Sequence, residues 1–547
     1  NRTMKTKIWI TGALCAATVA TAGAQGISND AVLGGKLLGV SYFDLTTMKM
    51  FSQRNYAYGT ARSSAMAGAF TSLGGDLASM GINPAGLGMY RASEFGLSLA
   101  VETNSTHESY PGDLWREDYN RTRFVPTNVS LALNLYQGSG ALTSFTFGFG
   151  YNRRADFNYR STVGLPHDNY TIGQIFERQL DGIPEADLSR DYSYGDFPTS
   201  MWGGILGYKA YMIDPADEND EYDLTTVNPY NPFNPGSGPG VLTDVDHLLQ
   251  SRTKGSIGEY NISAGMNFNN RVYVGLGIGI QDIYYRQDEI YSEQYVNDKE
   301  LPNYGGYLYN MYYGQHVKYT GTAVDFKLGI IVRPAGGLRV GVAFHSPSFV
   351  SVDQEYGADM QTELNDGQRH FAETNLLSYD YRFSSPPRLL TGISYTFGNV
   401  GVISADYERV WYNGMRISDK DGWRDDYKAA AKEIFKGADN VRVGAEFKPL
   451  PSLALRAGYA YYGSMLRDDD RVFDGPVGER SYNVSAGIGY RKGIISLDLA
   501  YTYMNEKFTS YDLFYYKEPG YEAISQSGYL TPERTRHLVT LSFGARF

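Results

Sequence analysis

The stretch that decides the fold is Leu538–Phe547, which reads LVTLSFGARF. From Val539 onward, apolar side chains occupy every second position, and small or polar side chains lie between them. Because successive side chains of a β-strand point to opposite faces, this strand has one apolar face and one polar face. A strand of this kind that ends on an aromatic residue is typical of the last strand of a membrane-embedded β-barrel.

The other end of the chain predicts export. Lysines precede an apolar run at 8–20, and small residues follow at 22–24, which is the pattern of a secretory signal. We expect residues 1–24 to be a signal peptide with a few upstream residues, and the mature chain to lack cysteine because Cys15 lies inside this segment. Phe547 at the carboxyl terminus resembles the assembly signal of bacterial outer-membrane barrels. Both ends therefore predict the bacterial cell outer membrane.

Composition narrows the class further. The 62 glycines and 47 tyrosines among 547 residues are more than an ordinary enzyme carries, and they suit a large barrel. No apolar run beyond the signal is long enough for a spanning helix of about 20 residues, and the mean hydropathy of -0.37 is too polar for a helical membrane protein. The net charge of -11 has no basic counterpart patch, so nucleic acid is excluded as a partner.

Alternation recurs after about residue 93 in segments of roughly ten residues, as expected for tilted membrane strands. Short and long connections alternate between these segments, which is the asymmetry of periplasmic turns and extracellular loops. The sequence therefore predicts an all-β fold: a fourteen-stranded antiparallel transmembrane β-barrel over residues 93–547. The expected strands are 93–104, 126–137, 141–160, 255–268, 272–292, 317–333, 338–354, 379–397, 401–412, 440–448, 453–463, 481–491, 494–509 and 532–547.

The polar faces of these strands carry charges of both signs, which favours a polar lumen. The alternative is a soluble β-sandwich or barrel whose apolar faces point inward. The export signal and the terminal aromatic residue favour the membrane barrel. The predicted polar lining of the lumen is Asp325, Lys327, Arg339, Asp406, Glu408, Arg442, Glu446, Arg456 and Asp498.

Residues 25–92 lack the barrel alternation and are rich in Gly, Ala and Ser, with a plausible helix at 61–70. Small side chains permit close packing, so we expect this segment to form a hatch, or plug, inside the lumen. The longest connection, at about 161–254, includes a helix-like stretch at 170–180. Loops of this length are usually functional or disordered.

The tripeptide Asn83-Pro84-Ala85 stands between the Gly/Ala-rich stretch and the first strand. With the signal, the hatch, fourteen strands and the closing aromatic residue, the mature chain resembles the FadL type (OMPP1/FadL/TodX) of outer-membrane transporters for hydrophobic compounds. The resemblance implies energy-independent diffusion of small hydrophobic compounds, such as long-chain fatty acids, through a barrel that the hatch plugs. It also implies ligand capture among the extracellular loops and a break in the third strand that opens a lateral path into the membrane.

In the third strand, the outward alternation decays after Gly148-Phe149-Gly150-Tyr151, as an inward kink would require. Glycine in a strand can mark a bulge or a close approach of another backbone. These four residues are therefore the candidate kink and lateral opening. Lumen-facing glycine also recurs in strands that need no gate, so an ordinary strand is the alternative.

The sequence predicts no enzyme. No nucleophile, base and acid arrangement is recognisable, histidines such as His345 and His537 lack metal-ligand spacing, and we expect neither a metal nor a cofactor. The expected partners are outer-membrane lipid, a small hydrophobic ligand and, in one reading, other outer-membrane or periplasmic proteins. In that alternative reading the barrel does not transport. It serves instead as a subunit or docking platform of a larger outer-membrane assembly or secretion complex, and its long loops favour this role.

Overall fold

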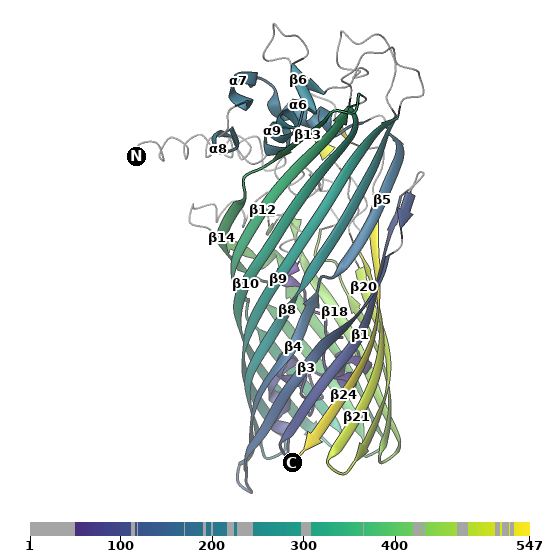
Figure 1. Cartoon of the computed structure of the whole chain (residues 1–547). Coiled ribbons are helices and arrows are strands. Elements are labelled where there is room, and N and C mark those ends of the chain that lie inside the picture. Colours follow the sequence, from purple (N-terminus) through teal and green to yellow (C-terminus); the bar gives the residue numbers. More distant parts are fainter. Residues whose placement is uncertain are drawn as a thin grey trace, which may run out of the picture.

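The alternating segments pair into a tall, closed β-barrel in the computed structural model (Figure 1). The structure describes residues 50–110, 115–117, 119–168, 170–189, 193–197, 201–215, 224–226, 244–296, 308–364, 366–418, 428, 431–432, 434–467, 480–508, 513, 515–516, 524–525 and 530–547. The expected signal peptide and the first part of the expected hatch, residues 1–49, lie outside this description.

Fourteen strands form the barrel wall, each antiparallel to its neighbours. The last strand pairs with the first from Glu94↔Arg546 to Ser109↔Thr531, and this pairing closes the barrel. The prediction of fourteen strands is confirmed. In chain order they are β1 (Glu94–Ser109), β3 (Tyr119–Gln137), β4 (Leu142–Asp156), β8 (Asp244–Phe268), β9 (Val272–Val296), β10 (Leu308–Ala335), β11 (Leu338–His345), β15 (Arg388–Phe397), β16 (Gly401–Trp411), β18 (Gly437–Leu450), β19 (Leu453–Tyr462), β20 (Arg480–Lys492), β21 (Ile495–Lys507) and β24 (Thr531–Arg546).

The lower part of the wall carries an apolar band on its outside. In β24, Leu541 is 54% exposed and the next residue, Ser542, is 6% exposed. Leu541 is aligned with Leu99 of β1 and with Leu499 of β21, so leucines of three adjacent strands form one row. Because the exposed row is apolar and the inner face is polar, the alternative of a soluble barrel with an apolar interior is wrong.

We expect Leu541→Arg to destabilise the folded barrel by about 2–4 kcal/mol, because arginine near the bilayer midplane must enter hydrocarbon. Ile495, which is 45% exposed beside the turn before β21, is the matched control at the membrane edge. There, Ile495→Arg should cost about 0–1 kcal/mol. Urea unfolding in lipid vesicles measures both costs, and equal values would contradict the assigned depth. Ser542 is a poor control because it contacts the hatch: its Oγ accepts a hydrogen bond from Ala61 N (2.6 Å). An arginine at this position would clash with the hatch.

One side of the barrel rises well above the apolar band, as Figure 1 shows for the wall of β8, β9, β10 and β12. β8 and β9 have 25 residues each and β10 has 28, far more than the nine to eleven that a membrane-spanning strand needs. The expected connection at 161–254 is therefore shorter than predicted, because both of its ends belong to strands. Further strands of this sheet are β2 (Trp115–Glu117), β5 (Tyr159–Asp168), β12 (Phe349–Leu364), β13 (Arg369–Glu373), β14 (Leu377–Ser384) and β17 (Arg416–Ser418).

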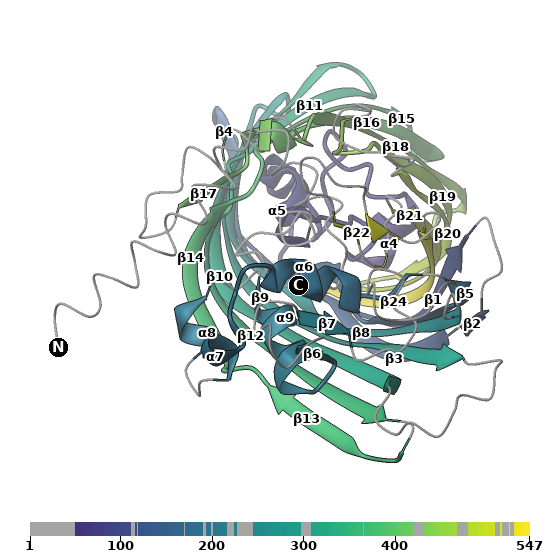
Figure 2. The same ribbon diagram turned by 90° about the horizontal axis from the view of Figure 1, so that it is seen from above.

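A helical cap packs on the raised wall. Its apolar residues, including Ile175, Phe176 and Leu206, are fully buried against wall residues such as Tyr313, which meets Phe176 edge-on at 5.7 Å between ring centroids. Seen from above, α6 lies over the lumen (Figure 2). The helix expected at 170–180 is present as α6. The cap comprises α6 (Gly173–Leu180), α7 (Glu185–Leu188), α8 (Ser193–Asp196), α9 (Trp202–Lys209), β6 (Ile213–Pro215) and β7 (Leu224–Thr226), while two further strands, β22 (Tyr515–Tyr516) and β23 (Ile524–Ser525), pair with each other.

The amino-terminal part of the described chain lies inside the barrel, where Figure 2 shows α4 and α5 encircled by the wall. The hatch contains α4 (Ala61–Ala65), α5 (Ser79–Ile82) and the 3₁₀ helix η1 (Pro84–Met89), and the helix expected at 61–70 is only five residues long. The sequence prediction of a plug inside the lumen is confirmed for the described residues from Met50 onward. In the described part of the chain, no helix is long and apolar enough to cross a membrane.

Candidate functional site: the plugged lumen and the third-strand break

The Asn83-Pro84-Ala85 motif forms a buried turn of the hatch. Asn83 caps η1, since its Oδ1 accepts a hydrogen bond from Ala85 N (3.1 Å). Its Nδ2 donates to Thr71 O (2.6 Å), which ties the turn to an earlier loop of the hatch. Because both ends of this side chain are used, the motif fixes the shape of the plug. Whether it also serves transport stays a prediction.

Glycines of the wall let this turn lie directly against the barrel. A Cβ atom built on Gly275 of β9 would fall on the backbone of Pro84 and Ala85, and one on Gly329 of β10 would fall on Asn83 Oδ1. The same holds around the lumen, where wall glycines face hatch backbone: Gly265, Gly341, Gly444 and Gly458. Glycine recurs on the lumen face because the hatch packs backbone to backbone against the wall.

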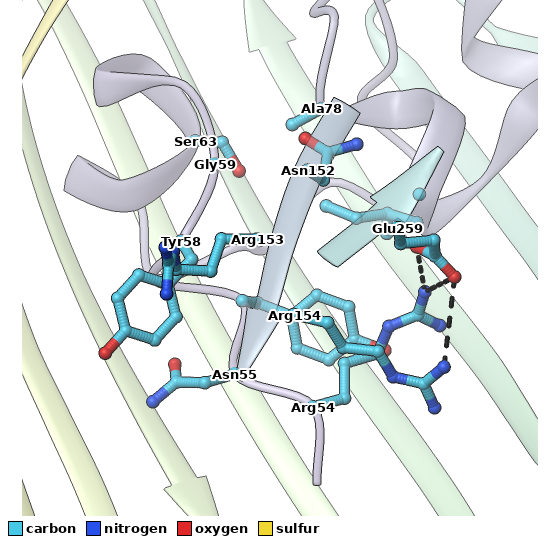
Figure 3. Close-up of a pocket in the computed structure, with 13 residues that line it drawn as sticks. Arg54, Asn55, Tyr58, Gly59, Ser63, Ala78, Asn152, Arg153, Arg154 and Glu259 are labelled. Atoms are coloured by element: carbon cyan, nitrogen blue, oxygen red, sulfur yellow. Dashed lines mark hydrogen bonds and ion pairs between the residues drawn. The ribbon is translucent and has the colours of Figure 1, made fainter. Parts of the chain in front are cut away.

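A first group of charges joins the hatch to β8 and β10. Glu259 accepts hydrogen bonds from Arg54 of the hatch (Nη2 to Oε2, 2.8 Å) and from Lys327 (Nζ to Oε1, 2.9 Å). Lys327 also donates to Asp325 (2.6 Å). Figure 3 shows Arg54 and Glu259 linked beside Arg154. All four side chains of the group are at most 6% exposed, so the hatch is held by fully desolvated ion pairs.

A second group surrounds Glu408 of β16. Its carboxylate accepts hydrogen bonds from Arg388 (3.2 Å), Arg442 (3.0 Å) and the hydroxyl of Tyr56 in the hatch (2.9 Å). The guanidinium of Arg442 also lies over the Tyr56 ring at 4.0 Å from its centroid. Neighbouring Asp406 accepts from the backbone N–H (2.9 Å) and the hydroxyl (2.7 Å) of hatch residue Thr71.

A third group lies toward the short turns. Glu446 accepts from Arg62 of the hatch (2.9 Å) and from Arg456 (2.7 Å), which also donates to Asp498 (2.6 Å). Arg339 donates to the hatch carbonyl of Leu73 (2.6 Å). All nine residues of the predicted polar lining therefore lie on the lumen side, and five of them contact the hatch directly: Arg339, Asp406, Glu408, Arg442 and Glu446.

The prediction omitted two buried acids of the same lining. Glu259 holds Arg54, and Glu102 of β1 accepts a hydrogen bond from the hydroxyl of hatch residue Tyr58 (2.8 Å). Both share a face with polar neighbours two residues away, Asn261 and Asn104, so the period of two could have revealed them. The space left between hatch and wall beside Glu259 is about 30 Å³, enough for water and too small for a hydrophobic ligand (Figure 3). The hatch therefore fills the lumen at this level.

The third strand is interrupted above this level. Pairing of β3 with β4 ends at Asn128↔Asn152, β4 ends at Asp156, and β5 begins at Tyr159. Beyond that point β5 pairs with β8 and briefly with β2, while the described part of β3 pairs with β1. We call this discontinuity between β3 and the β4–β5 junction the seam.

Side chains rather than a strand ladder close the seam. Asn104 of β1 donates to the carbonyl of Asn158 (2.8 Å), in the two-residue gap between β4 and β5. Arg123 of β3 forms an ion pair with Asp156, which also binds Arg153 (2.7 Å). These contacts cross the seam without fixing the backbones to each other. Side-chain contacts can break singly, whereas a ladder opens cooperatively.

The interruption lies beyond the expected kink. Gly148, Phe149, Gly150 and Tyr151 keep a regular ladder with β3 and β8, and Phe149 is 51% exposed on the outer face. A Cβ on Gly148 would meet hatch residue Met80, so this glycine accommodates the plug. The alternation decays after Tyr151 because the register with β8 shifts between Arg153 and Ala155. A lateral opening at 148–151 has no irregularity in the ladder to support it.

The protein is thus a closed barrel with an internal hatch and an interrupted third strand, and known proteins resemble it in sequence and in fold. Residues 253–513 match the family of outer membrane protein transport proteins (OMPP1/FadL/TodX). Over these residues, a little under half of the chain, the protein is similar to that family. The closed barrel with its apolar outer band is that of an outer-membrane protein. A comparison with curated protein sequences finds no match.

Solved structures similar to this chain include three barrels. The toluene transporter TodX of P. putida has 14% identity, covering 89% of this chain and 98% of its own, with a TM-score of 0.49. A FadL homologue of Pseudomonas aeruginosa has 13% identity, 94% and 100% coverage, and a TM-score of 0.48. The monoaromatic hydrocarbon channel CymD has 12% identity, 90% and 99% coverage, and a TM-score of 0.46. No group of side chains suited to a metal occurs in the part of the chain that the structure describes.

Proposed function

We propose that the protein lets small hydrophobic compounds cross the outer membrane by energy-independent diffusion, and that they leave the barrel sideways through the seam. The observation that carries this proposal is the interrupted third strand above a lumen that the hatch fills. A straight path would require at least three groups of buried ion pairs to separate. A path through the seam requires weaker links to move, such as the contacts of Asn104 and Arg123.

The outer surface beside the seam suits an apolar compound. Phe124 of β3 is 66% exposed and faces outward next to Val101, which is 44% exposed. A compound that leaves water for this surface and the adjoining lipid gains roughly 25 cal/mol per Å² of buried apolar area. Diffusion of the compound down its concentration gradient needs no energy source. The substrate class we propose comprises long-chain fatty acids and monoaromatic hydrocarbons.

A crosslink across the seam tests the proposal. With cysteine-free mature protein as background, Asn104→Cys and Asn158→Cys place thiols on its two sides, where Asn104 already contacts residue 158. A short reducible thiol crosslinker should then abolish most uptake of labelled oleate and toluene into cells, and reduction should restore it, because the seam can no longer widen.

The matched control is the pair Thr103→Cys and Thr122→Cys. These residues are ladder partners on β1 and β3 at the same height, with hydroxyls 2.9 Å apart, so their crosslink joins strands that are already paired. Uptake should be unchanged. Full uptake in the crosslinked 104–158 variant would count against lateral exit, and a loss in both pairs would point to a general effect of crosslinking.

The docking role remains a second candidate because of the raised wall. The cap and wall bury a large apolar cluster of their own, and the outer strand β13 pairs only with β12 in the described structure. Phe371 on β13 and Leu376 beside it are 61% and 71% exposed. If this edge holds a partner, Phe371→Asp with Leu376→Asp should release a stoichiometric envelope protein in mild detergent while uptake persists. Unchanged composition of the purified sample would remove this candidate.

A further inference from the structure

A second cavity opens between hatch and wall on the side of the short turns. Its volume is about 350 Å³, within the lower range of small-molecule sites. Hatch residues Leu73 and Met89 line one side, and Leu453 and Arg491 of the wall line the other. Since short turns mark the periplasmic end of such barrels, the cavity faces the periplasm. It is separate from the seam, which lies at the other end of the hatch.

The charges around this cavity do not balance. Two acidic side chains line it, Glu446 and Asp498. Six cationic side chains line it: Arg62, Arg339, Lys448, Arg456, Arg491 and Arg546. The surplus is positive although the whole chain carries a net charge of -11. Like charges gathered around one cavity repel each other, and a bound anion would relieve that repulsion.

Both acidic side chains of the cavity lining already form ion pairs. Glu446 binds Arg62 and Arg456, with Lys448 at 3.5 Å, and Asp498 binds Arg456. Arg546 is held by Glu94 (2.6 Å), which lies outside the cavity lining. Arg339 and Arg491 therefore form no ion pair within 4 Å among the residues that the structure describes.

Arg339 has a further unsatisfied donor. One Nη group donates to Leu73 O (2.6 Å), but its buried Nε–H has no hydrogen-bond partner within the described chain. Because this Nε–H is shielded from solvent, an anion in the cavity would meet the other guanidinium N–H groups of Arg339, which lines the cavity. Guanidinium groups present paired N–H donors whose geometry matches the oxygens of carboxylate and phosphate.

We infer that this periplasmic cavity binds a small anion that carries a carboxylate or phosphate group, with Arg339 and Arg491 as its recognising residues. The anion would lie between hatch residue Arg62 and the wall residues Arg339 and Arg491, so its binding would stabilise the seated hatch against the barrel. The inference is independent of lateral transport, since its site faces the opposite end of the hatch.

Titration calorimetry of the folded barrel in an uncharged maltoside detergent at low salt tests this site. The probes are inorganic phosphate, octyl phosphate and octanol. Phosphate should bind the wild type, and Arg339→Gln with Arg491→Gln should weaken it at least about tenfold, because charged hydrogen bonds are lost. Octanol, which lacks the charge, should not compete. If octyl phosphate binds much more tightly than phosphate, the natural ligand is an amphiphile with an anionic head group. If the two bind equally well, the natural ligand is a free anion.

Arg416→Gln is the matched control, because Arg416 lies exposed on β17 at the extracellular end. It should leave phosphate binding unchanged. The heat-dependent shift in gel migration of folded barrels verifies that each variant is folded before titration. Wild-type binding of phosphate and octyl phosphate no tighter than that of the double variant would overturn the inference, as would octanol binding as well as octyl phosphate.

Discussion

Replacing Glu408 by glutamine should destabilise the barrel by about 3–5 kcal/mol, the largest effect we expect from a single side chain. The carboxylate is fully buried and neutralises Arg388 and Arg442 at the same time. Glutamine keeps the shape but removes the negative charge, so buried Arg388 loses its ion pair and buried Arg442 keeps only the longer one with Asp406 at 3.6 Å. Urea unfolding of the refolded protein in vesicles measures the loss.

The matched control is Glu355→Gln on the raised wall. Glu355 pairs with Lys318 at 3.0 Å, but both side chains are about 40% exposed. Water screens this pair, so its removal should cost only about 0–1 kcal/mol. If Glu408→Gln cost no more than Glu355→Gln, the Glu408 group could not be a desolvated anchor of the hatch.

The second large effect concerns the close approach of hatch and wall. Gly275→Val should unseat the hatch, because its side chain would occupy the positions of Pro84 and Ala85 backbone atoms. Overpacking commonly costs about 1–3 kcal/mol, and backbone atoms relax less readily than side chains do. We expect the strands to assemble and the plug to be displaced. Trypsin should then cleave at Arg54 and Arg62, which are only 6% and 22% exposed when the hatch is seated.

Gly140→Val provides the control. Gly140 lies in the short turn before β4, and a Cβ there would meet nothing within 4 Å. This variant should resist trypsin in the hatch as the wild type does. If the hatch of Gly275→Val also resists trypsin, the hatch can shift within the lumen without leaving it. Close packing of the hatch would then not explain why glycine occupies these wall positions.

The sequence predicted the barrel well because membrane strands obey a strict period of two. Leu541 and Ser542 could be assigned to opposite faces from their neighbours alone, and the nine charged lining residues followed from the same rule. Small residues such as Ala61 and Ala65 also predicted a plug, because small side chains let a segment pack closely inside a lumen.

Other features depend on contacts between distant residues, which one sequence does not reveal. The partner of Glu408 is Tyr56, more than 350 residues away, and nothing local specifies that pair. The glycines at 148 and 150 looked like a kink, although at least Gly148 faces the hatch. The observed interruption at Asp156 follows a register shift with β8 between Arg153 and Ala155. The raised wall was missed because polar strands in water lack the apolar alternation that marks a strand in lipid.

The height of that wall determines where the protein meets its surroundings. At about 3.3 Å per residue, the 28 residues of β10 extend roughly 90 Å, or roughly 65 Å along the membrane normal at the usual tilt of such strands. An apolar band of about 25 Å accounts for less than half of this height. Roughly 40 Å therefore stands clear of the bilayer on one flank. The cap at its top is the first part reached from outside, by antibodies and bacteriophages as much as by nutrients, so we expect selection for variation to concentrate there and to spare the plug.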